Sequence, residues 1–279
     1  MQKNRGGKMS GFCDIHTHIL PGIDDGARDW DMCLEMIDRA WEGGVRRIIA
    51  TPHYLPWKEK KPNPVQIVRL CNEVQRRART ELGYEIRIYP GQEIYYHVDM
   101  IDGIRRGEIL TMAGTRHILV EFPIDISAQQ LKQAVRHICE ARYTPILAHI
   151  ERYECLRSNG TLEEAAELGA LFQINIKSLQ GSMLNQTTRW CKHQLLEQRI
   201  DFLASDMHNL SSRPPTSYEM LDWVGKKLDR EYQRDILLRN ALRMGIEKEE
   251  MKKKKKFPVL NRRIAAFETE MIISFARFA

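Results

Sequence analysis

The chain alternates between short, nearly continuous apolar runs and longer segments in which an apolar residue recurs every three or four positions. The first pattern is typical of buried strands and the second of amphipathic helices. In residues 31–41, for example, Leu34, Ile37 and Trp41 share one face, and Gly43-Gly44 follows as a stop signal. The predicted strands are 12–19, 45–51, 85–94, 109–112 and 118–122 (a hairpin), 145–150, 171–176 and 201–205. The predicted helices are 31–41, 63–83, 128–141, 162–168, 188–198, 217–228 and 231–244.

Predicted strands and helices follow one another in about seven repeated units. Strands that are apolar almost throughout indicate a parallel sheet covered on both faces, which is typical of α/β proteins. A chain of 279 residues has the right length for one α/β barrel. We therefore predict a closed or slightly irregular barrel. An open, doubly wound sheet stays the alternative, because the pattern does not determine the order of the strands.

Histidines and carboxylates follow the ends of these strands. His16 and His18, two positions apart on a strand, point to the same side, and imidazole is a common ligand of transition metals. The other ligand-type residues at strand ends are Asp25, His53, Glu93, Glu121, His149, Asp206 and His208. In a βα barrel these ends meet at one face. The set is larger than one ion needs and suits two or three bridged metals.

The remaining histidines are His97, His117, His137 and His193, which we interpret as surface or helix-face residues. Two loop arginines, Arg152 and Arg213, follow the predicted ligands His149 and His208 closely in the sequence. A guanidinium group matches phosphate oxygens in shape and charge. Metals together with arginines favour a phosphate ester as the substrate, although solvated loop arginines are the alternative.

Two cysteine-arginine spacings resemble a different phosphatase mechanism. Cys33…Arg39 and Cys71…Arg77 both match Cys-x₅-Arg, but both lie inside predicted helices. The interior of a helix cannot offer the inward-facing backbone N–H groups that cradle a phosphate. The chain also lacks a Gly-x-Ser-x-Gly nucleophile motif. We therefore exclude cysteine-dependent and serine-dependent chemistry.

The distribution of charge and the cysteine content predict the kind of partner and the cell compartment of the protein. The net charge is +6, but Lys252–Lys256 contributes +5, residues 1–8 contribute +3 and residues 257–279 contribute +1, which leaves −3 for residues 9–251. This distribution predicts no nucleic-acid-binding face on the body. Six scattered cysteines indicate reduced thiols and a cytoplasmic protein, with no integral membrane segment. We predict one domain over 9–251, followed by a basic linker and tail over 252–279.

Taken together, these motifs resemble one known superfamily over about residues 12–245. The matching segments are 14–26 (DIHTHILPGIDDG), 50–54 (ATPHY), 91–94 (GQEI), 120–123 (VEFP), 148–153 (AHIERY) and 205–208 (SDMH). This set is similar to the PHP (polymerase and histidinol phosphatase) superfamily. Within it, the chain resembles the bacterial manganese-dependent tyrosine-protein phosphatases of capsule and exopolysaccharide systems.

The resemblance implies a distorted (β/α)₇ TIM-like barrel, the PHP fold, with a trinuclear metal site at the C-terminal ends of the strands. The metals would be Mn²⁺, with Fe, Zn, Co or Mg as alternatives. The implied ligand groups are His16, His18 and Asp206; Glu121 and His149; and Asp25, His53 and His208, with Glu93 bridging the first two groups. Arg152 and Arg213 would bind the phosphate.

The activity implied is hydrolysis of phosphotyrosine by a metal-bridging hydroxide. The implied partner is a phosphotyrosine protein, the tyrosine-rich tail of a bacterial tyrosine kinase that controls polysaccharide export, and an oligomer is possible. One alternative is a small-molecule phosphatase of the histidinol-phosphatase type, which needs a more enclosed pocket. A metal-dependent nuclease would need a basic track that the body does not offer, and a non-enzymatic scaffold would not need the full ligand set.

Overall fold

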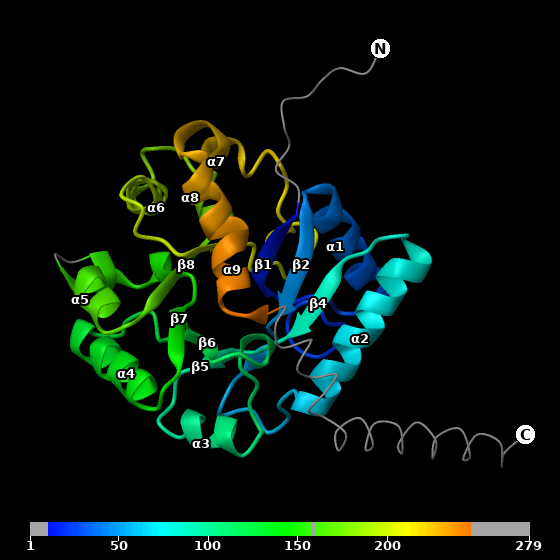
Figure 1. Cartoon of the computed structure of the whole chain (residues 1–279), viewed down its shortest axis with the longest axis horizontal. Helices are drawn as coiled ribbons and strands as arrows, with labels where there is room; N and C mark the ends of the chain where they lie inside the picture. The colour runs from blue at the N-terminus through cyan, green and yellow to red at the C-terminus, as the bar shows by residue number, and fades with distance from the viewer. Residues whose placement is uncertain (1–10, 158–159, 247–279) are drawn as a thin grey trace, which may run out of the picture.

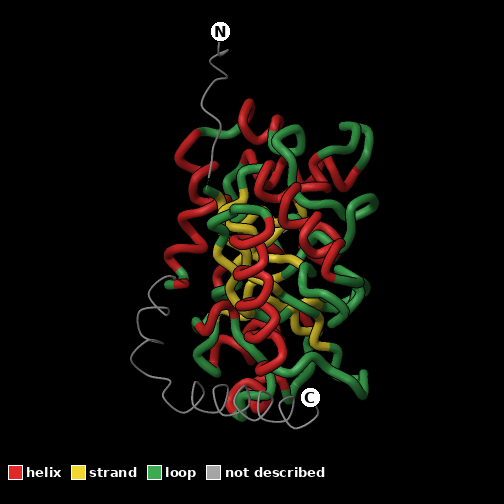
Figure 2. The backbone as a smooth tube through the Cα atoms, turned by 90° about the vertical axis from the view of Figure 1, so that its right-hand side faces the viewer, coloured by secondary structure: helices red, strands yellow, loops and turns green. Residues whose placement is uncertain are grey.

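A computed structural model of the chain describes residues 11–157 and 160–246. The strands are β1 Phe12–Thr17, β2 Val45–Ala50, β3 His53–Tyr54, β4 Arg87–Pro90, β5 Glu93–Tyr95, β6 His117–Glu121, β7 Thr144–Leu147, β8 Leu171–Asn175 and β9 Phe202–Ala204. The helices are α1 Trp30–Glu42, α2 Pro64–Glu81, α3 Met100–Arg105, α4 Ala128–Glu140, α5 Thr161–Glu167, α6 Gln186–Leu196, α7 Asp222–Lys227, α8 Arg230–Arg234 and α9 Asn240–Arg243. Strands lie in the middle of the molecule and helices surround them (Figure 1, Figure 2).

Every pairing between the strands is parallel, and the sheet is curled. The hydrogen-bonded orders are β1-β2-β4 and β3-β5-β6-β7-β8-β9. Only Thr51-Pro52 separates β2 from β3, and only Gly91-Gln92 separates β4 from β5. Two strands of the first sheet therefore run directly into two strands of the second. An isolated parallel bridge joins Thr17 to Met207, which brings the end of β1 beside the end of β9.

Two hydrophobic clusters occupy the two sides of the curled sheet. Alternate strand residues belong to different clusters, because side chains on a strand alternate between its faces. Ile118 and Val120 of β6 pack with the surrounding helices, whereas Leu119 packs with Ile146 and Phe202 in the inner cluster. The inner cluster also includes Ala241, next to Met244 and Ile246. The last helical segment therefore closes one side of the interior (Figure 1).

Side-chain caps begin two of the long helices, and the first of them, at Asn63, is the one that the sequence predicts. Asn63 caps α2, accepting a hydrogen bond from the backbone N–H of Gln66 at 2.8 Å, and Pro64 occupies the first turn. Ser127 and Gln130 form a capping box at α4. The predicted 231–244 helix is present as α8 and α9 joined by a π-helical turn, Asp235–Arg239. The predicted 217–228 helix begins only at Asp222.

The predicted hairpin over 109–122 is wrong. Residues 109–111 form no strand, and Met112–Gly114 forms a 3₁₀ turn that leads into β6. β6 pairs in parallel with β5 and β7. The turn residues Gly114 and Thr115 do end an apolar run, but that run pairs with no strand: Ile109 is buried in the outer cluster and Met112 in the inner cluster. Burial of Ile109 and Met112 explains the misleading apolar pattern.

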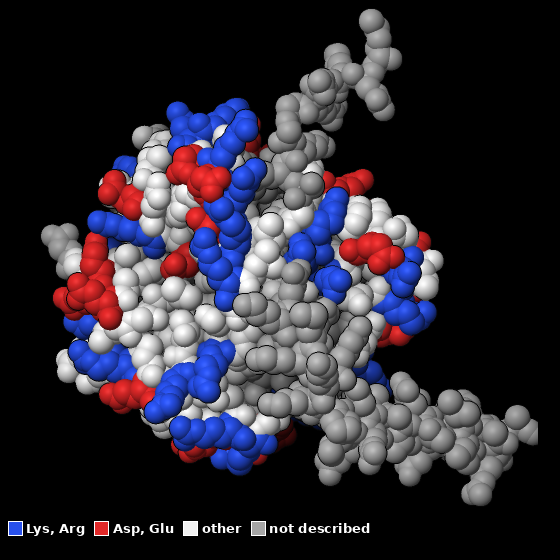
Figure 3. Space-filling model, viewed as in Figure 1, with Lys and Arg blue, Asp and Glu red and all other residues white. Residues whose placement is uncertain are grey.

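The surface of the molecule carries mixed charge. On the face shown in Figure 3, basic and acidic side chains are interspersed. Arg239 and Arg243, for example, both pair with Asp235. All six cysteines are free thiols. No helix among the described residues is long and apolar enough to cross a membrane. The predicted tail, 252–279, and the end of the predicted domain lie outside the described residues.

Candidate metal centre

The curled sheet brings all nine predicted ligand residues together in one place. Two of these positions follow from the strands themselves. Leu119 and Ala204 face the interior of the curled sheet. Glu121 and Asp206 each lie two residues further along the chain, and side chains two positions apart on a strand point to the same side. Backbone pairing aligns the remaining ends. The N–H of Asp206 donates to the carbonyl of His16 at 3.0 Å, and the N–H of His18 donates to the carbonyl of Met207 at 2.9 Å.

The ring nitrogens and carboxylate oxygens of these residues are in direct contact. His16 Nε2 lies 3.2 Å from Glu93 Oε2 and 3.4 Å from Asp206 Oδ1. His149 Nε2 lies 2.9 Å from Glu93 Oε1 and 3.4 Å from Glu121 Oε1. Three sets have ligand atoms within 4.8 Å of one another: His18, Asp25, His53 and His208; His16, His18 and Asp206; and His53, Glu93 and Glu121. The other four histidines belong to none of these sets.

Burial and charge shift the titration of these groups. Burial opposes protonation of His53, but hydrogen bonds to Asp25 and Glu93 outweigh it and raise the pKa of His53 to about 11. Burial likewise opposes protonation of His18, and Asp24 raises its pKa to about 9. Burial and the nearby Glu93 charge raise the pKa of the Glu121 carboxyl to about 7. The carboxylates therefore attract positive charge into the centre, as either protons or metal ions.

The donor set fits divalent metal ions. Six of the nine side chains are buried, those of His53 and Glu121 are each 18 % exposed, and that of Asp25 is 52 % exposed. Buried His149 Nδ1 lacks a hydrogen-bond partner within the described residues, and His53 Nδ1 meets Glu93 Oε2 at 3.0 Å, a contact that requires a proton or another cation between the two atoms. Such unsatisfied atoms are costly in a protein interior unless another group binds them. Mixed imidazole and carboxylate ligands suit first-row transition metals.

Both predicted arginines reach the edge of this centre. Arg152 Nη2 donates to Asp206 Oδ2 at 2.9 Å, and Arg213 Nη2 donates to Asp25 Oδ2 at 3.1 Å. Each guanidinium is about one third exposed. A guanidinium has five N–H donors, so each arginine can hold a ligand carboxylate and still offer donors to an anion in solvent.

Three buried polar residues that the sequence analysis missed hold the ligands in place. Gln173 Oε1 accepts from the backbone N–H of His149 at 2.8 Å and lies 3.1 Å from His16 Nδ1. Asn175 Nδ2 donates to Asp206 Oδ2 at 2.9 Å. Asp24 Oδ2 lies 2.7 Å from His18 Nδ1. A signal was present: Gln173 and Asn175 interrupt the apolar strand 171–176 at alternate positions, as Asp14 and His16 do in β1.

Gln173 orients the imidazole ring of His16, and this role can be tested. Its side-chain oxygen can only accept, so His16 presents an Nδ1–H to it and keeps the Nε2 lone pair for the centre. We expect Gln173→Met to weaken binding of Mn²⁺ about 10- to 100-fold, measured by calorimetric titration. The matched control is Gln129→Met, because Gln129 is exposed on α4. Equal metal affinities for both variants and the parent protein would contradict this role.

The backbone at two ligands adopts a conformation that the sequence does not reveal. His149 and Asp206 have φ values of 33° and 52°, in the left-handed region. Non-glycine residues in this region are uncommon and cluster at functional sites. Gly26 shows a related constraint, because a Cβ at this position would lie 2.0 Å from the carbonyl oxygen of His18. The left-handed backbone sets the direction in which the His149 and Asp206 side chains leave the ends of their strands.

The Cys-x₅-Arg matches lie in helices, as predicted. Cys33 is buried within α1 and Cys71 within α2. Burial raises the pKa of the Cys33 thiol to about 12. The thiolate is the nucleophilic form of cysteine, so neither position provides a phosphatase nucleophile.

Comparisons with known proteins agree with this geometry. The chain is 31% identical over 251 residues to the tyrosine-protein phosphatase YwqE of Bacillus subtilis (strain 168), covering 88% of this chain and 98% of YwqE. It is 29% identical to the tyrosine-protein phosphatase CpsB of Streptococcus pneumoniae, covering 81% and 95%. A solved structure from work on YwqE and CpsB as unique metal-dependent tyrosine phosphatases matches with a TM-score of 0.72 at 32% identity, covering 79% of this chain and 89% of that chain.

A more distant solved structure shares the fold alone. It is a mutant of the organophosphorus hydrolase from Deinococcus radiodurans, with a TM-score of 0.55 at 12% identity, covering 84% of this chain and 92% of that chain. The profile described as "Capsular polysaccharide synthesis, CpsB/CapC" matches residues 12–245, which contain every predicted ligand and both arginines. This chain therefore belongs to the CpsB/CapC family of capsular polysaccharide synthesis.

Proposed function

We propose that this protein is a metal-dependent tyrosine-protein phosphatase, a phosphoric monoester hydrolase. The observation that carries the proposal is the buried cluster of imidazoles and carboxylates with two arginines at its edge. This combination suits a substrate that carries several negatively charged oxygens. The names and activities of the relatives agree, since YwqE and CpsB are metal-dependent tyrosine phosphatases.

Three divalent ions, Mn²⁺ by preference, are proposed for the centre. His16, His18 and Asp206 would hold one ion. Glu121 and His149 would hold a second, with Glu93 between these two groups. Asp25, His53 and His208 would hold the third. The close sets formed by His16, His18 and Asp206, and by His18 with Asp25, His53 and His208, support the first and third groups. The 3.4 Å approach of His149 Nε2 to Glu121 Oε1 supports the second.

The bound metals would supply a water-derived nucleophile at neutral pH and neutralise negative charge on the substrate. The chain's own residues orient the reaction. Arg152, fixed by Asp206, would bind phosphate oxygens through its outward donors, and Arg213 would do so from the opposite loop. Arg213 Nη1 also lies 2.8 Å from His208 Nε2, so this guanidinium contacts the candidate ligands through two of its nitrogens.

The low pKa of the leaving group explains why no general acid is assigned to this site. A tyrosine hydroxyl has a pKa of about 10, so it departs as the phenolate more readily than an alkyl alcohol departs as an alkoxide. As the physiological partner we propose the tyrosine-rich tail of a bacterial tyrosine kinase in capsule or exopolysaccharide synthesis, with the reaction in the cytoplasm. The capsular polysaccharide family assignment supports this choice.

The curled sheet is further interpreted as a distorted (β/α)₇ barrel. Counting β2 with β3 and β4 with β5 as two interrupted strands gives seven strands, and the Thr17–Met207 bridge is where the last meets the first. The alternation of outer and inner clusters supports this interpretation, because a closed barrel separates its interior from the helices around it.

A substrate panel tests the proposed function. Purified protein with Mn²⁺ is offered a phosphotyrosine peptide, histidinol phosphate and single-stranded DNA, and the release of phosphate or of nucleotides is measured. We expect the phosphotyrosine peptide to have the highest kcat/KM. Preferential turnover of histidinol phosphate would assign the small-molecule alternative, and cleavage of DNA would assign a nuclease. Absence of peptide hydrolysis with Mn²⁺ present would reject the proposal.

The arginines are expected to act on the phosphate. Arg152→Ala and Arg213→Ala should each lower kcat/KM for the phosphotyrosine peptide by about 10²-fold, because each removes donors that face developing charge. Arg152→Lys should restore activity only in part, since an ammonium cannot form the planar fork. Arg189→Ala, on the exposed side of α6, is the control. Full activity in the Arg152 and Arg213 variants would leave these residues with no role in binding phosphate.

A further inference from the structure

Large apolar side chains are exposed beside the metal centre on three neighbouring loops. Trp57 is 61 % exposed, Val98 69 % and Ile124 66 %. They follow β3, β5 and β6, which are adjacent in the sheet, and each of these strands carries a candidate ligand. We call these three residues the apolar rim. Exposed apolar patches next to a polar site are typical of surfaces that bind another molecule.

The apolar rim lies within reach of a polypeptide bound at the centre. Ile124 is three residues beyond Glu121, and Trp57 is four residues beyond His53. Consecutive Cα atoms are about 3.8 Å apart, so these separations are at most about 11–15 Å. An extended peptide covers roughly 3.3–3.6 Å per residue. A residue three or four positions from a phosphotyrosine can therefore reach the apolar rim while the phosphate occupies the centre.

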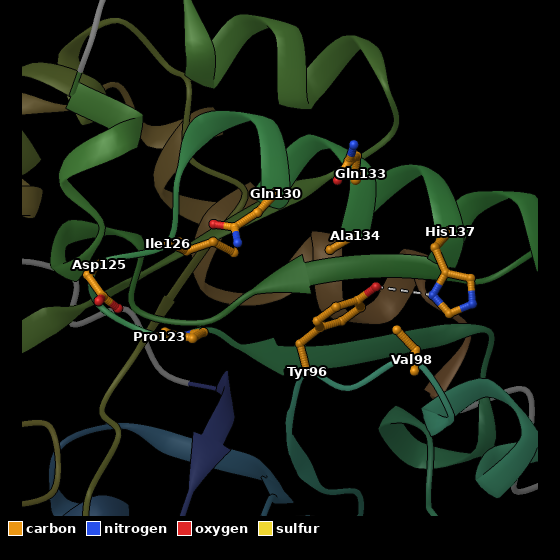
Figure 4. Close-up of a pocket in the computed structure, with 9 residues that line it drawn as sticks. All are labelled: Tyr96, Val98, Pro123, Asp125, Ile126, Gln130, Gln133, Ala134 and His137. Atoms are coloured by element: carbon orange, nitrogen blue, oxygen red, sulfur yellow. Dashed lines mark hydrogen bonds between the residues drawn. The ribbon is translucent and has the colours of Figure 1, made fainter.

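A groove continues from the apolar rim along α4. It has a volume of about 620 Å³, and its lining residues are Tyr96, Val98, Pro123, Asp125, Ile126, Gln130, Gln133, Ala134 and His137. In Figure 4, Tyr96 and Val98 lie across from the α4 residues, and Tyr96 Oη lies 3.3 Å from His137 Nδ1. The N–H of Tyr96 donates to the carbonyl of Glu121 at 2.9 Å, which joins the groove to a ligand-bearing strand.

The chemistry of the groove fits a peptide. Val98, Ile126 and Ala134 offer apolar contacts, and the amides of Gln130 and Gln133 can bond with a peptide backbone. Part of the apolar rim is also held in place, because the Trp57 ring packs edge-on against Tyr95 with 4.6 Å between ring centroids. An ordered aromatic side chain loses little conformational entropy on binding.

We propose that the apolar rim and the groove bind the polypeptide that carries the phosphotyrosine, through a large apolar side chain three or four residues away from it. This inference rests on the proposed tyrosine-phosphatase function and specifies its substrate class. The phosphate would lie between the metals and the arginines of the β7 and β9 loops, and the flanking chain would leave over the β3, β5 and β6 loops. A small phosphomonoester has no atoms that reach this surface.

The test compares two variants with the parent protein. The rim variant is Trp57→Ser/Val98→Ser/Ile124→Ser. The control variant is Met183→Ser/Leu184→Ser, which removes two exposed apolar residues from the β8–α6 loop. The substrates are p-nitrophenyl phosphate and two phosphotyrosine peptides that carry either leucine or serine at the third and fourth positions on both sides. Mn²⁺ is present throughout, and kcat and KM are measured separately.

We expect the parent and the control variant to prefer the leucine peptide over the serine peptide by about tenfold in kcat/KM, mainly through KM. The rim variant should lose this preference and hydrolyse p-nitrophenyl phosphate at the parental rate. No preference in the parent, or an equal preference in the rim variant, would overturn the inference. A parallel loss on p-nitrophenyl phosphate would also overturn it, because the rim would then support the centre itself.

Two further measurements separate the remaining outcomes. If sedimentation shows that only the rim variant changes its oligomeric state while peptide kinetics stay parental, the rim contacts a second copy of the chain and the inference is wrong. If the parent hydrolyses neither peptide nor p-nitrophenyl phosphate, the proposed function fails by itself. Fluorescence anisotropy of the two labelled peptides then still decides whether the rim binds the leucine peptide more tightly than the serine peptide.

Discussion

Replacement of His16 by alanine is expected to abolish hydrolysis of a phosphotyrosine peptide, with a loss in kcat/KM of about 10³-fold or more. His16 is fully buried, and its Nε2 faces both Glu93 and Asp206. Its replacement removes a proposed metal ligand and one of the imidazoles that contact these two carboxylates. Removing a single donor to a transition state already costs about 10²–10³-fold, so loss of a ligand that helps to hold the metals should cost at least as much.

The measurement is steady-state kinetics with Mn²⁺, together with the metal content of the purified variant. His193→Ala is the control, because His193 is exposed on α6 and belongs to none of the close ligand sets. Circular dichroism should show that both variants are folded. If folded His16→Ala protein retains parental kcat/KM, the assignment of the centre is wrong.

Removal of metal is expected to have the second large effect. Chelation should eliminate hydrolysis, because residues 11–157 and 160–246 show no cysteine or serine nucleophile that could replace metal-activated water. It should also lower the melting temperature by about 5–10 °C relative to protein at saturating Mn²⁺, since a ligand at about 100 times its Kd contributes about 2.7 kcal/mol. The buried carboxylates Glu93 and Asp206 would lose the cations proposed for them in the same step.

Differential scanning fluorimetry and activity assays on the same samples check this result. Addition of Mn²⁺ should restore both activity and melting temperature, whereas addition of Ca²⁺, which prefers all-oxygen ligands, should restore neither fully. Unchanged hydrolysis after complete removal of metal would contradict the proposed chemistry. An unchanged melting temperature would show that the metals contribute little to folding.

Much of the fold follows from local sequence patterns. The 3.6-residue period and the cap at Asn63 predict α2. The apolar runs predict the strands to within a few residues. The predicted hairpin is wrong because burial of Ile109 and Met112 outside any strand produces the same apolar pattern as a strand. Strand pairing joins residues far apart in the sequence, so no local window contains it.

The sequence by itself determined which residues have ligand chemistry and that they follow strand ends, because alternation along a strand and the punctuation between elements are local properties. Only the tertiary structure decided that these ends converge, since that depends on parallel pairing around a curled sheet. It also decided the supporting contacts of Gln173, Asn175 and Asp24 and the left-handed backbone at His149 and Asp206. These contacts depend on how neighbouring strand ends pack, and that packing is fixed only when the whole sheet has formed.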